Sequence, residues 1–157
     1  MAKLDKVCKL VGSVMACELA GMFGALFTMP SISTWYSTLN KPSFTPPNWL
    51  FGPVWVTLYL LMGISLYLVW EKGLVKSRMA YTFFSLQLLF NAFWTIIFFG
   101  LEMPSLAFIE IIILWFLVAA TTYQFYKISK PASVLLIPYL VWLTIAAALN
   151  YSVMILN

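Results

Sequence analysis

The stretch Trp35–Trp55 reads WYSTLNKPSFTPPNWLFGPVW and separates two long apolar runs. It holds three of the seven tryptophans and four of the eight prolines, but only one charged residue, Lys41. Because proline fixes φ and has no N–H to donate, Pro42, Pro46 and Pro47 cannot lie inside an undisturbed helix. Tryptophan and tyrosine favour the boundary between lipid headgroups and hydrocarbon. The stretch is therefore typical of a stiff aromatic loop at a membrane surface, with a form suited to covering a site.

The composition of the whole chain excludes a soluble domain. Of its 157 residues 63% are hydrophobic and 9% are charged, whereas a soluble protein carries about 25% charged residues. The net charge of +4 is scattered and forms no basic run, so nucleic acid is not an expected partner. The chain contains no histidine, which removes the commonest metal ligand and general base. We expect no metal site, no catalytic residue set and no required cofactor.

Five apolar segments are long enough to cross about 30 Å of hydrocarbon. The fold class we predict is an all-α membrane protein, a bundle of five transmembrane helices in a single domain over residues 1–157. The expected spans are about 10–29, 49–70, 79–99, 105–126 and 132–156, with residues 30–48 as a loop that covers the bundle. The first run is longer than the apolar core of a signal peptide, which favours a retained helix over a cleaved leader.

The distribution of lysine and arginine predicts the orientation. With five spans, the amino terminus and the links at 71–78 and 127–131 share one side of the membrane, and these segments carry eight of the nine basic residues. Lys41 is the single basic residue on the other side. The positive-inside rule therefore predicts that the amino terminus lies inside and the aromatic loop outside.

A row of small residues runs along the first predicted helix at a spacing of four. Such a row lets two helix backbones approach closely within a membrane. It favours equally a homodimer interface and packing against another helix of the same chain. The row consists of Gly12, Ala16, Ala20 and Gly24.

Two carboxylates lie within predicted spans, Glu18 near the middle of the first and Glu110 near the start of the fourth. An acidic residue inside a membrane is a functional candidate. For Glu110, a structural hydrogen bond or a side chain that reaches the surface explains the position equally well. Nothing in the spacing brings the two carboxylates together, so the sequence does not indicate an acid–base pair.

Three predicted helices carry stripes of aromatic and uncharged polar residues on one face. Amides in hydrocarbon need partners, which are either neighbouring helices or a bound ligand. Taken one by one the stripes indicate helix contacts, but together with the aromatic loop they indicate a site for a large, flat, apolar ligand. The stripes are Trp55 and Tyr59; Gln87, Asn91, Trp94 and Thr95; and Trp142, Ala146, Leu149 and Asn150.

At these residues the chain resembles the translocator protein family, also called tryptophan-rich sensory proteins or peripheral-type benzodiazepine receptors (TspO/MBR). The resemblance covers almost the whole chain from about Gly21 to Asn157. Its motifs are Trp35-Tyr36, Leu39, Lys41-Pro42, Phe44, Pro46-Pro47, Phe51-Gly52-Pro53-Val54-Trp55, Asn91, Trp94, Glu110, Leu114-Trp115, Pro138-Tyr139, Trp142, Ala146 and Leu149-Asn150.

The resemblance implies a five-helix bundle, often dimeric, whose first loop covers a pocket between the helices. It implies a receptor or sensor for porphyrins and related tetrapyrroles, with other flat apolar molecules as further ligands. Aromatic faces would stack on the macrocycle and Asn91 would bind near its polar edge. The implied ligand-binding residues are Tyr36, Pro46, Phe51, Trp55, Tyr59, Asn91, Trp94, Trp142, Ala146 and Leu149.

The resemblance leaves two alternative activities, light-dependent oxidation of porphyrin and transport of porphyrin-like or sterol-like molecules. No nucleophile–base pair or metal cluster is visible, so binding is the leading hypothesis and enzymatic activity the weaker one. The carboxyl end lacks the basic residue found there in animal members. This favours a bacterial or archaeal plasma membrane, where we expect a multi-pass protein in contact with lipid and paired as a homodimer.

Overall fold

The computed structural model describes residues 2–73 and 78–157, and in these ranges every regular element is helical. The order is α1 (Ala2–Ser33), α2 (Trp35–Thr38), α3 (Asn48–Trp70), α4 (Arg78–Thr95), the π-helical turn η1 (Ile96–Gly100), α5 (Pro104–Ile128) and α6 (Lys130–Leu156). Within the described residues, five helical stretches are long and apolar enough to cross a membrane. The predicted all-α membrane bundle is confirmed.

Prolines set several helix boundaries, but not the first one expected. Pro47 has extended backbone and precedes α3, while Pro104 opens α5, where its missing N–H leaves no bond unmade. Helix α1 continues through Pro30 to Ser33, so the connection starts later than the expected residue 30. Next to the helix end, the Thr34 hydroxyl donates to the carbonyl oxygen of Pro30 (2.9 Å). The loop segment, residues 34–47, also contains the short helix α2.

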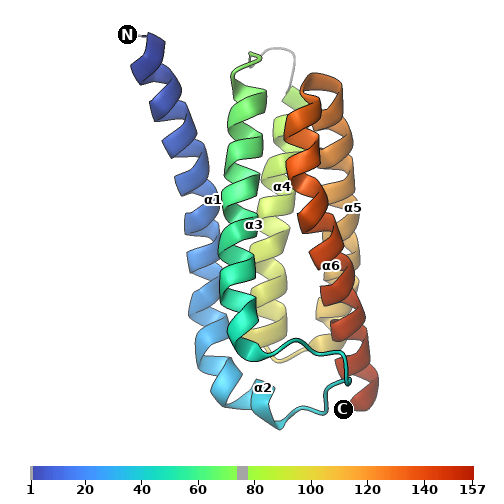
Figure 1. Ribbon diagram of the computed structural model, residues 1–157. Helices are drawn as coiled ribbons and strands as arrows, with labels where there is room; N and C mark the ends of the chain where they lie inside the picture. The colour runs from blue at the N-terminus through green and yellow to red at the C-terminus, as the bar shows by residue number, and fades with distance from the viewer. Residues whose placement is uncertain (1, 74–77) are drawn as a thin grey trace.

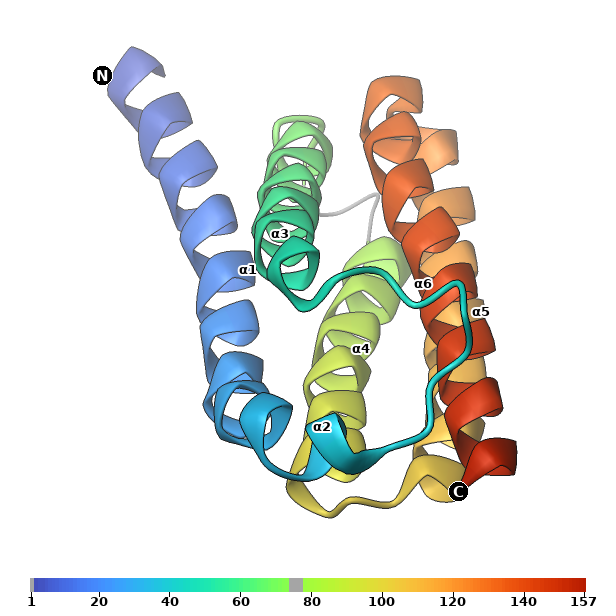
Figure 2. The ribbon, with the colours of Figure 1, turned by 60° about the horizontal axis from the view of Figure 1, so that its bottom comes forward.

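The long helices lie side by side, and the loop segment covers one end of the bundle (Figure 1). Helix α1 packs on α3 and α4, α3 packs on α6, and α5 packs on α4 and α6. We call the covered end the loop end and the opposite end the amino-terminal end. The carboxyl terminus lies at the loop end. In Figure 2 the loop segment runs from α2 across to α6 and returns to the start of α3.

Two close contacts bring α1 and α3 together, one toward the amino-terminal end and one near the middle of the bundle. Gly63 lies so close to α1 that a Cβ built on it would be 2.5 Å from Cα of Val14. Gly21 lies against the Tyr59 ring, which a Cβ at this position would overlap. Glycine is needed at both places because another helix occupies the space of a side chain.

The row of small residues divides between two environments. Gly24 faces α4, where a Cβ would lie 3.3 Å from the Thr95 hydroxyl oxygen. Gly12 has no atom within 4 Å of a built Cβ, and Gly12 and Ala16 are both exposed. The loop-end part of the row therefore packs inside the chain. Its other part stays a predicted homodimer surface.

Candidate ligand-binding cavity

A cavity of about 480 Å³ lies inside the loop half of the bundle. Its walls come from α1, α2, α3, α6 and the junction of α4 with η1, and of the described residues none from α5 takes part. Pockets for drug-sized ligands have volumes of roughly 300–1,000 Å³ and mainly apolar walls. The cavity fits this range.

Most of the residues that the sequence indicates as a site surround this one cavity. Trp55 and Trp142 come from different helices and both line it. Two of the ten predicted residues, Pro46 and Asn91, are not among the lining residues. The eight that line it are Tyr36, Phe51, Trp55, Tyr59, Trp94, Trp142, Ala146 and Leu149.

Asn91 lies behind the wall and is 2% exposed. The Tyr59 hydroxyl donates to Oδ1 of Asn91, and Nδ2 of Asn91 donates to the Tyr139 hydroxyl oxygen (2.9 Å). The amide is used by the protein itself, so it fixes the position of the Tyr59 ring at the cavity. The expected direct contact between Asn91 and a ligand stays a prediction, and the structure adds this supporting role. Pro46 lies half-buried in the loop segment.

A second buried amide holds the Trp94 indole. Nε1 of Trp94 donates to Oδ1 of Asn150 (3.0 Å), and Nδ2 of Asn150 donates to the carbonyl oxygen of Pro104 (2.8 Å). The Trp94 ring also stacks on Phe98, with centroids 5.3 Å apart and planes at 21°. A rigid indole with its N–H already paired presents an apolar face to the cavity.

Further aromatic pairs continue the wall. Trp55 lies 5.7 Å from the Tyr59 ring, and Phe51 meets Trp142 edge-on at 5.9 Å. Such offset and edge-on pairs are the preferred arrangements of aromatic rings. The walls therefore have fixed orientations before any ligand binds.

The π-helical turn supplies two lining residues that the sequence analysis missed, Phe98 and Phe99. The N–H of Leu101 donates to the carbonyl oxygen of Ile96 (2.8 Å), a five-residue step that widens the turn. Consecutive residues of an α-helix point in different directions, whereas here both rings reach the cavity. No signal in the sequence marks this turn.

Helix α1 forms a further wall of the cavity. The sequence analysis did not assign this wall to the site either. The row of small residues, to which Gly24 belongs, is the sequence signal that could have identified this wall. It would have done so if the row had been assigned to packing inside the chain. Small side chains here keep α1 from filling the cavity. The α1 lining includes Glu18, Gly21, Met22, Gly24, Ala25, Thr28, Met29 and Ile32.

The loop segment closes the loop end through polar contacts. Nζ of Lys41 donates to the carbonyl oxygens of Tyr36 (2.6 Å) and Leu39 (3.1 Å), and it lies 4.6 Å from the centroid of the Tyr36 ring. Burial raises the pKa of the Tyr36 phenol, so its hydroxyl stays protonated beside the cavity. The backbone N–H of Asn40 donates to Oδ1 of Asn157 (2.9 Å), and Nδ2 of Asn157 donates back to the Asn40 carbonyl oxygen (3.1 Å).

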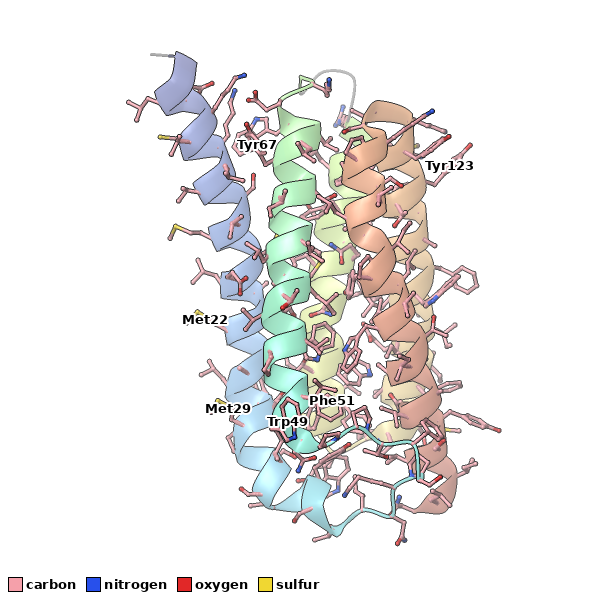
Figure 3. All side chains as sticks on the ribbon, viewed as in Figure 1. Met22, Met29, Trp49, Phe51, Tyr67 and Tyr123 are labelled. Atoms are coloured by element: carbon pink, nitrogen blue, oxygen red, sulfur yellow. The ribbon has the colours of Figure 1, made fainter. Side chains whose placement is uncertain are left out.

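The cavity reaches the lipid-facing surface between α1 and α3. Met22 and Met29 on α1 are 64% and 73% exposed, and Trp49 at the start of α3 is 71% exposed, yet all three line the cavity. Figure 3 shows Met22 and Met29 along α1, and Trp49 and Phe51 at the loop end of α3. The site is thus covered at the loop end and more open toward lipid.

Comparison with known proteins assigns the chain to a family. The TspO/MBR family model matches residues 13–156. The chain is 48% identical to the tryptophan-rich protein TspO of Archaeoglobus fulgidus over 152 residues, 96% of this chain and 98% of the relative.

More distant relatives cover similar shares of the chain. The tryptophan-rich sensory protein of Cereibacter sphaeroides is 39% identical over 142 residues (90% of this chain, 87% of the relative). The translocator protein of Homo sapiens is 38% identical over 146 residues (91% and 86%). The chain is a multi-pass integral membrane protein that belongs to the TspO/MBR family.

Proposed function

We propose that the protein is a membrane receptor or sensor that binds tetrapyrroles, porphyrin above all, and other flat apolar molecules in the cavity beneath the loop segment. The observation that carries the proposal is the convergence of indole and phenol rings from four parts of the chain on one apolar cavity. These rings are Tyr36 of α2, Trp55 and Tyr59 of α3, Trp94 of α4, and Trp142 of α6.

The fixed orientation of these rings supports recognition of a flat ligand. Trp94 and Tyr59 are held by amides behind them, so little side-chain freedom is lost when a ligand stacks on them. The size of the cavity and its apolar walls favour a large planar ring system over a small polar molecule.

We expect the protein to bind metal-free porphyrin. When haem is offered instead, we expect no strong bond between the protein and the haem iron. The chain contains no histidine, and the methionines and tyrosines that line the cavity are less common haem ligands. A haem absorption spectrum that stays close to that of the five-coordinate or free pigment is the expected result.

The test is a titration of the purified protein in lipid nanodiscs with protoporphyrin IX, followed by tryptophan fluorescence. We expect saturable quenching, and a loss of affinity in Trp142→Phe and Trp55→Phe. Trp70→Phe, at the last residue of α3 and outside the cavity lining, is the matched control and should bind as the wild type does. Equal affinity in all four proteins would reject the cavity as the site.

Light-dependent oxidation of bound porphyrin is a second candidate, because four oxidisable indoles line the cavity: Trp49, Trp55, Trp94 and Trp142. The comparison is between porphyrin loss under illumination with the protein, with empty nanodiscs, and with Trp142→Phe. Equal rates with and without the protein would exclude this activity while leaving binding intact.

A further inference from the structure

Glu18 and Tyr59 mark the inner end of the cavity, the end nearest the middle of the bundle. Glu18 is the lining residue of α1 closest to the amino terminus, and Tyr59 is the last lining residue of α3. Gly21, about one turn after Glu18, lies against the Tyr59 ring. Ile32, which lines the loop end, follows Glu18 by about 21 Å of helix. The Glu18 carboxyl therefore belongs to the deep part of the site.

Many other polar groups of the wall already have partners. The hydroxyl of Tyr59 and the N–H of Trp94 donate to buried amides. The hydroxyl of Thr28 donates to the carbonyl oxygen of Gly24 (3.2 Å), and that of Thr95 donates to the carbonyl oxygen of Asn91 (3.2 Å).

The Glu18 carboxyl has no such partner. Among the described residues it takes part in no hydrogen bond and no ion pair. It is also the only acidic residue of the cavity lining that the structure describes, and that lining contains no lysine or arginine. Lys6 and Lys9 of α1 lie about 18 and 13.5 Å along the helix from Glu18 and are engaged elsewhere, since Lys6 pairs with Glu71 (3.4 Å) and Lys9 with Asp5 (2.7 Å). An acceptor in an apolar site without a protein donor is free to accept a hydrogen bond from what fills the site.

We infer that Glu18 makes the inner end of the cavity a recognition point for the cationic N–H group of a flat apolar ligand, a protonated amine or ring nitrogen. The inference rests on the proposed function in that it uses the same cavity. It adds a chemical preference that the aromatic walls do not supply, because stacking accepts neutral, cationic and anionic rings of the same shape.

The same carboxyl disfavours an acidic group at the inner end. A ligand carboxylate there would face the Glu18 carboxyl, another hydrogen-bond acceptor, with no lysine or arginine of the described lining to compensate it. A porphyrin that carries carboxylate side chains would therefore bind with those groups directed away from Glu18, toward the loop end.

The experiment compares three probes with one ring system: 9-aminoacridine, a cation with N–H donors; acridine, which is neutral; and acridine-9-carboxylate, an anion. Binding is measured by fluorescence in nanodiscs of zwitterionic phosphatidylcholine, with empty nanodiscs subtracted and protoporphyrin IX as competitor. For the wild type we expect the cation to bind about tenfold tighter than the neutral ring, and the anion to bind weakest.

Three variants decide the result. Glu18→Gln keeps the shape and an acceptor oxygen but removes the charge, and Glu18→Leu removes both, so the preference for the cation should fall in the first and vanish in the second. Affinity for neutral acridine should stay within about twofold in both variants, which shows that the cavity remains intact. Glu110→Gln changes a buried acid of α5 outside the described lining and should keep the wild-type preference.

Each other outcome rejects the inference. It is wrong if the preference persists in Glu18→Leu, if Glu110→Gln abolishes it equally, or if protoporphyrin IX binds to the protein but displaces none of the acridines. Protoporphyrin binding without a preference among the acridines would reject the role of Glu18 and keep the proposed function. A Glu18-dependent preference in a protein that binds no porphyrin would reject the proposed function and keep the role of Glu18.

Discussion

Two glycines on the same helix show how the two halves of the bundle differ. Gly63 of α3 lies against the backbone of Val14, with 2.5 Å between a built Cβ and Cα of that residue, whereas a Cβ on Gly52 would meet nothing within 4 Å. The first lies where α1 and α3 pack tightly, and the second lines the cavity where the same two helices leave room between them. One pair of helices thus supports both a closed contact and a ligand site.

The two ends of the α1–α3 pair also differ in the contacts that hold the helices together. At the amino-terminal end, Glu71 after α3 accepts ion pairs from Lys6 (3.4 Å) and Lys9 (3.7 Å) of α1. At the loop end the two helices are connected by the loop segment, which contacts α6 through Asn40 and Asn157. A helix pair fixed at one end can surround a cavity at the other without loss of the fold.

The largest effect is expected from Gly63→Ala. The added methyl group cannot fit without moving the α1 backbone, and overpacking of this kind costs about 3 kcal/mol of the free energy of unfolding. Gly52→Ala is the matched control and should change that free energy by less than about 1 kcal/mol. The measurement is reversible unfolding in detergent followed by circular dichroism. Similar unfolding midpoints for the two variants would contradict the difference between the halves.

The next effect is expected from Asn91→Leu, which tests whether the polar cluster behind the wall holds the cavity in shape. The change leaves the buried hydroxyls of Tyr59 and Tyr139 without their partner, which costs about 2 kcal/mol. Porphyrin affinity should fall as well, because the Tyr59 ring loses its fixed position. The free energy of unfolding and the porphyrin affinity are both measured on the same nanodisc samples.

Gln87→Leu is the control for that prediction. Gln87 is equally buried, but among the described residues its oxygen has no hydrogen-bond partner and its Nε2 reaches only the Met62 sulfur, at 3.8 Å. Replacing an amide with so few partners should cost clearly less than replacing Asn91. Equal losses would mean that general core packing, and not the Tyr59–Asn91–Tyr139 cluster, is being measured.

The sequence predicts the frame of this molecule better than its cavity. The five spans follow from hydrophobic length, and the eight lining residues follow from aromatic stripes and a family resemblance, because both are local patterns. The α1 wall does not follow, since a row such as Gly12 to Gly24 indicates close approach without naming the partner. The role of Asn91 depends on Tyr139, which lies 48 residues away in the chain.

Two local features of the structure could not be predicted from the sequence either. The π-helical turn that brings Phe98 and Phe99 to the cavity has no characteristic sequence, because it depends on how the ends of α4 and α5 pack. Helix α1 passes the proline at position 30, which a composition-based boundary assigns to the loop. Both features widen or lengthen the loop half, so the errors of sequence reasoning concentrate around the site.

A smaller effect is expected from Lys41→Met, which keeps most of the length of the side chain and removes its charge. Nζ of Lys41 holds two carbonyl oxygens of the loop segment, so its loss should loosen the cover and raise the porphyrin dissociation rate about tenfold. The free energy of unfolding should change little. Lys72→Met, an exposed residue at the other end of the bundle, should dissociate at the wild-type rate. Stopped-flow measurement with apomyoglobin as porphyrin acceptor distinguishes the two.

The smallest effect is expected from Asn157→Ala, and its size tests which opening a ligand uses. Asn157 joins the loop segment to α6 through exposed hydrogen bonds, and bonds of this kind contribute about 0.5 kcal/mol. If ligands leave beneath the loop, the dissociation rate should rise about twofold, and Lys41→Met should increase it further in the double variant. If they leave between α1 and α3, where Met22 and Met29 line an exposed edge, neither loop variant should alter the rate. In that case Gly52→Leu, which adds bulk at the same lipid-facing side, should slow dissociation instead.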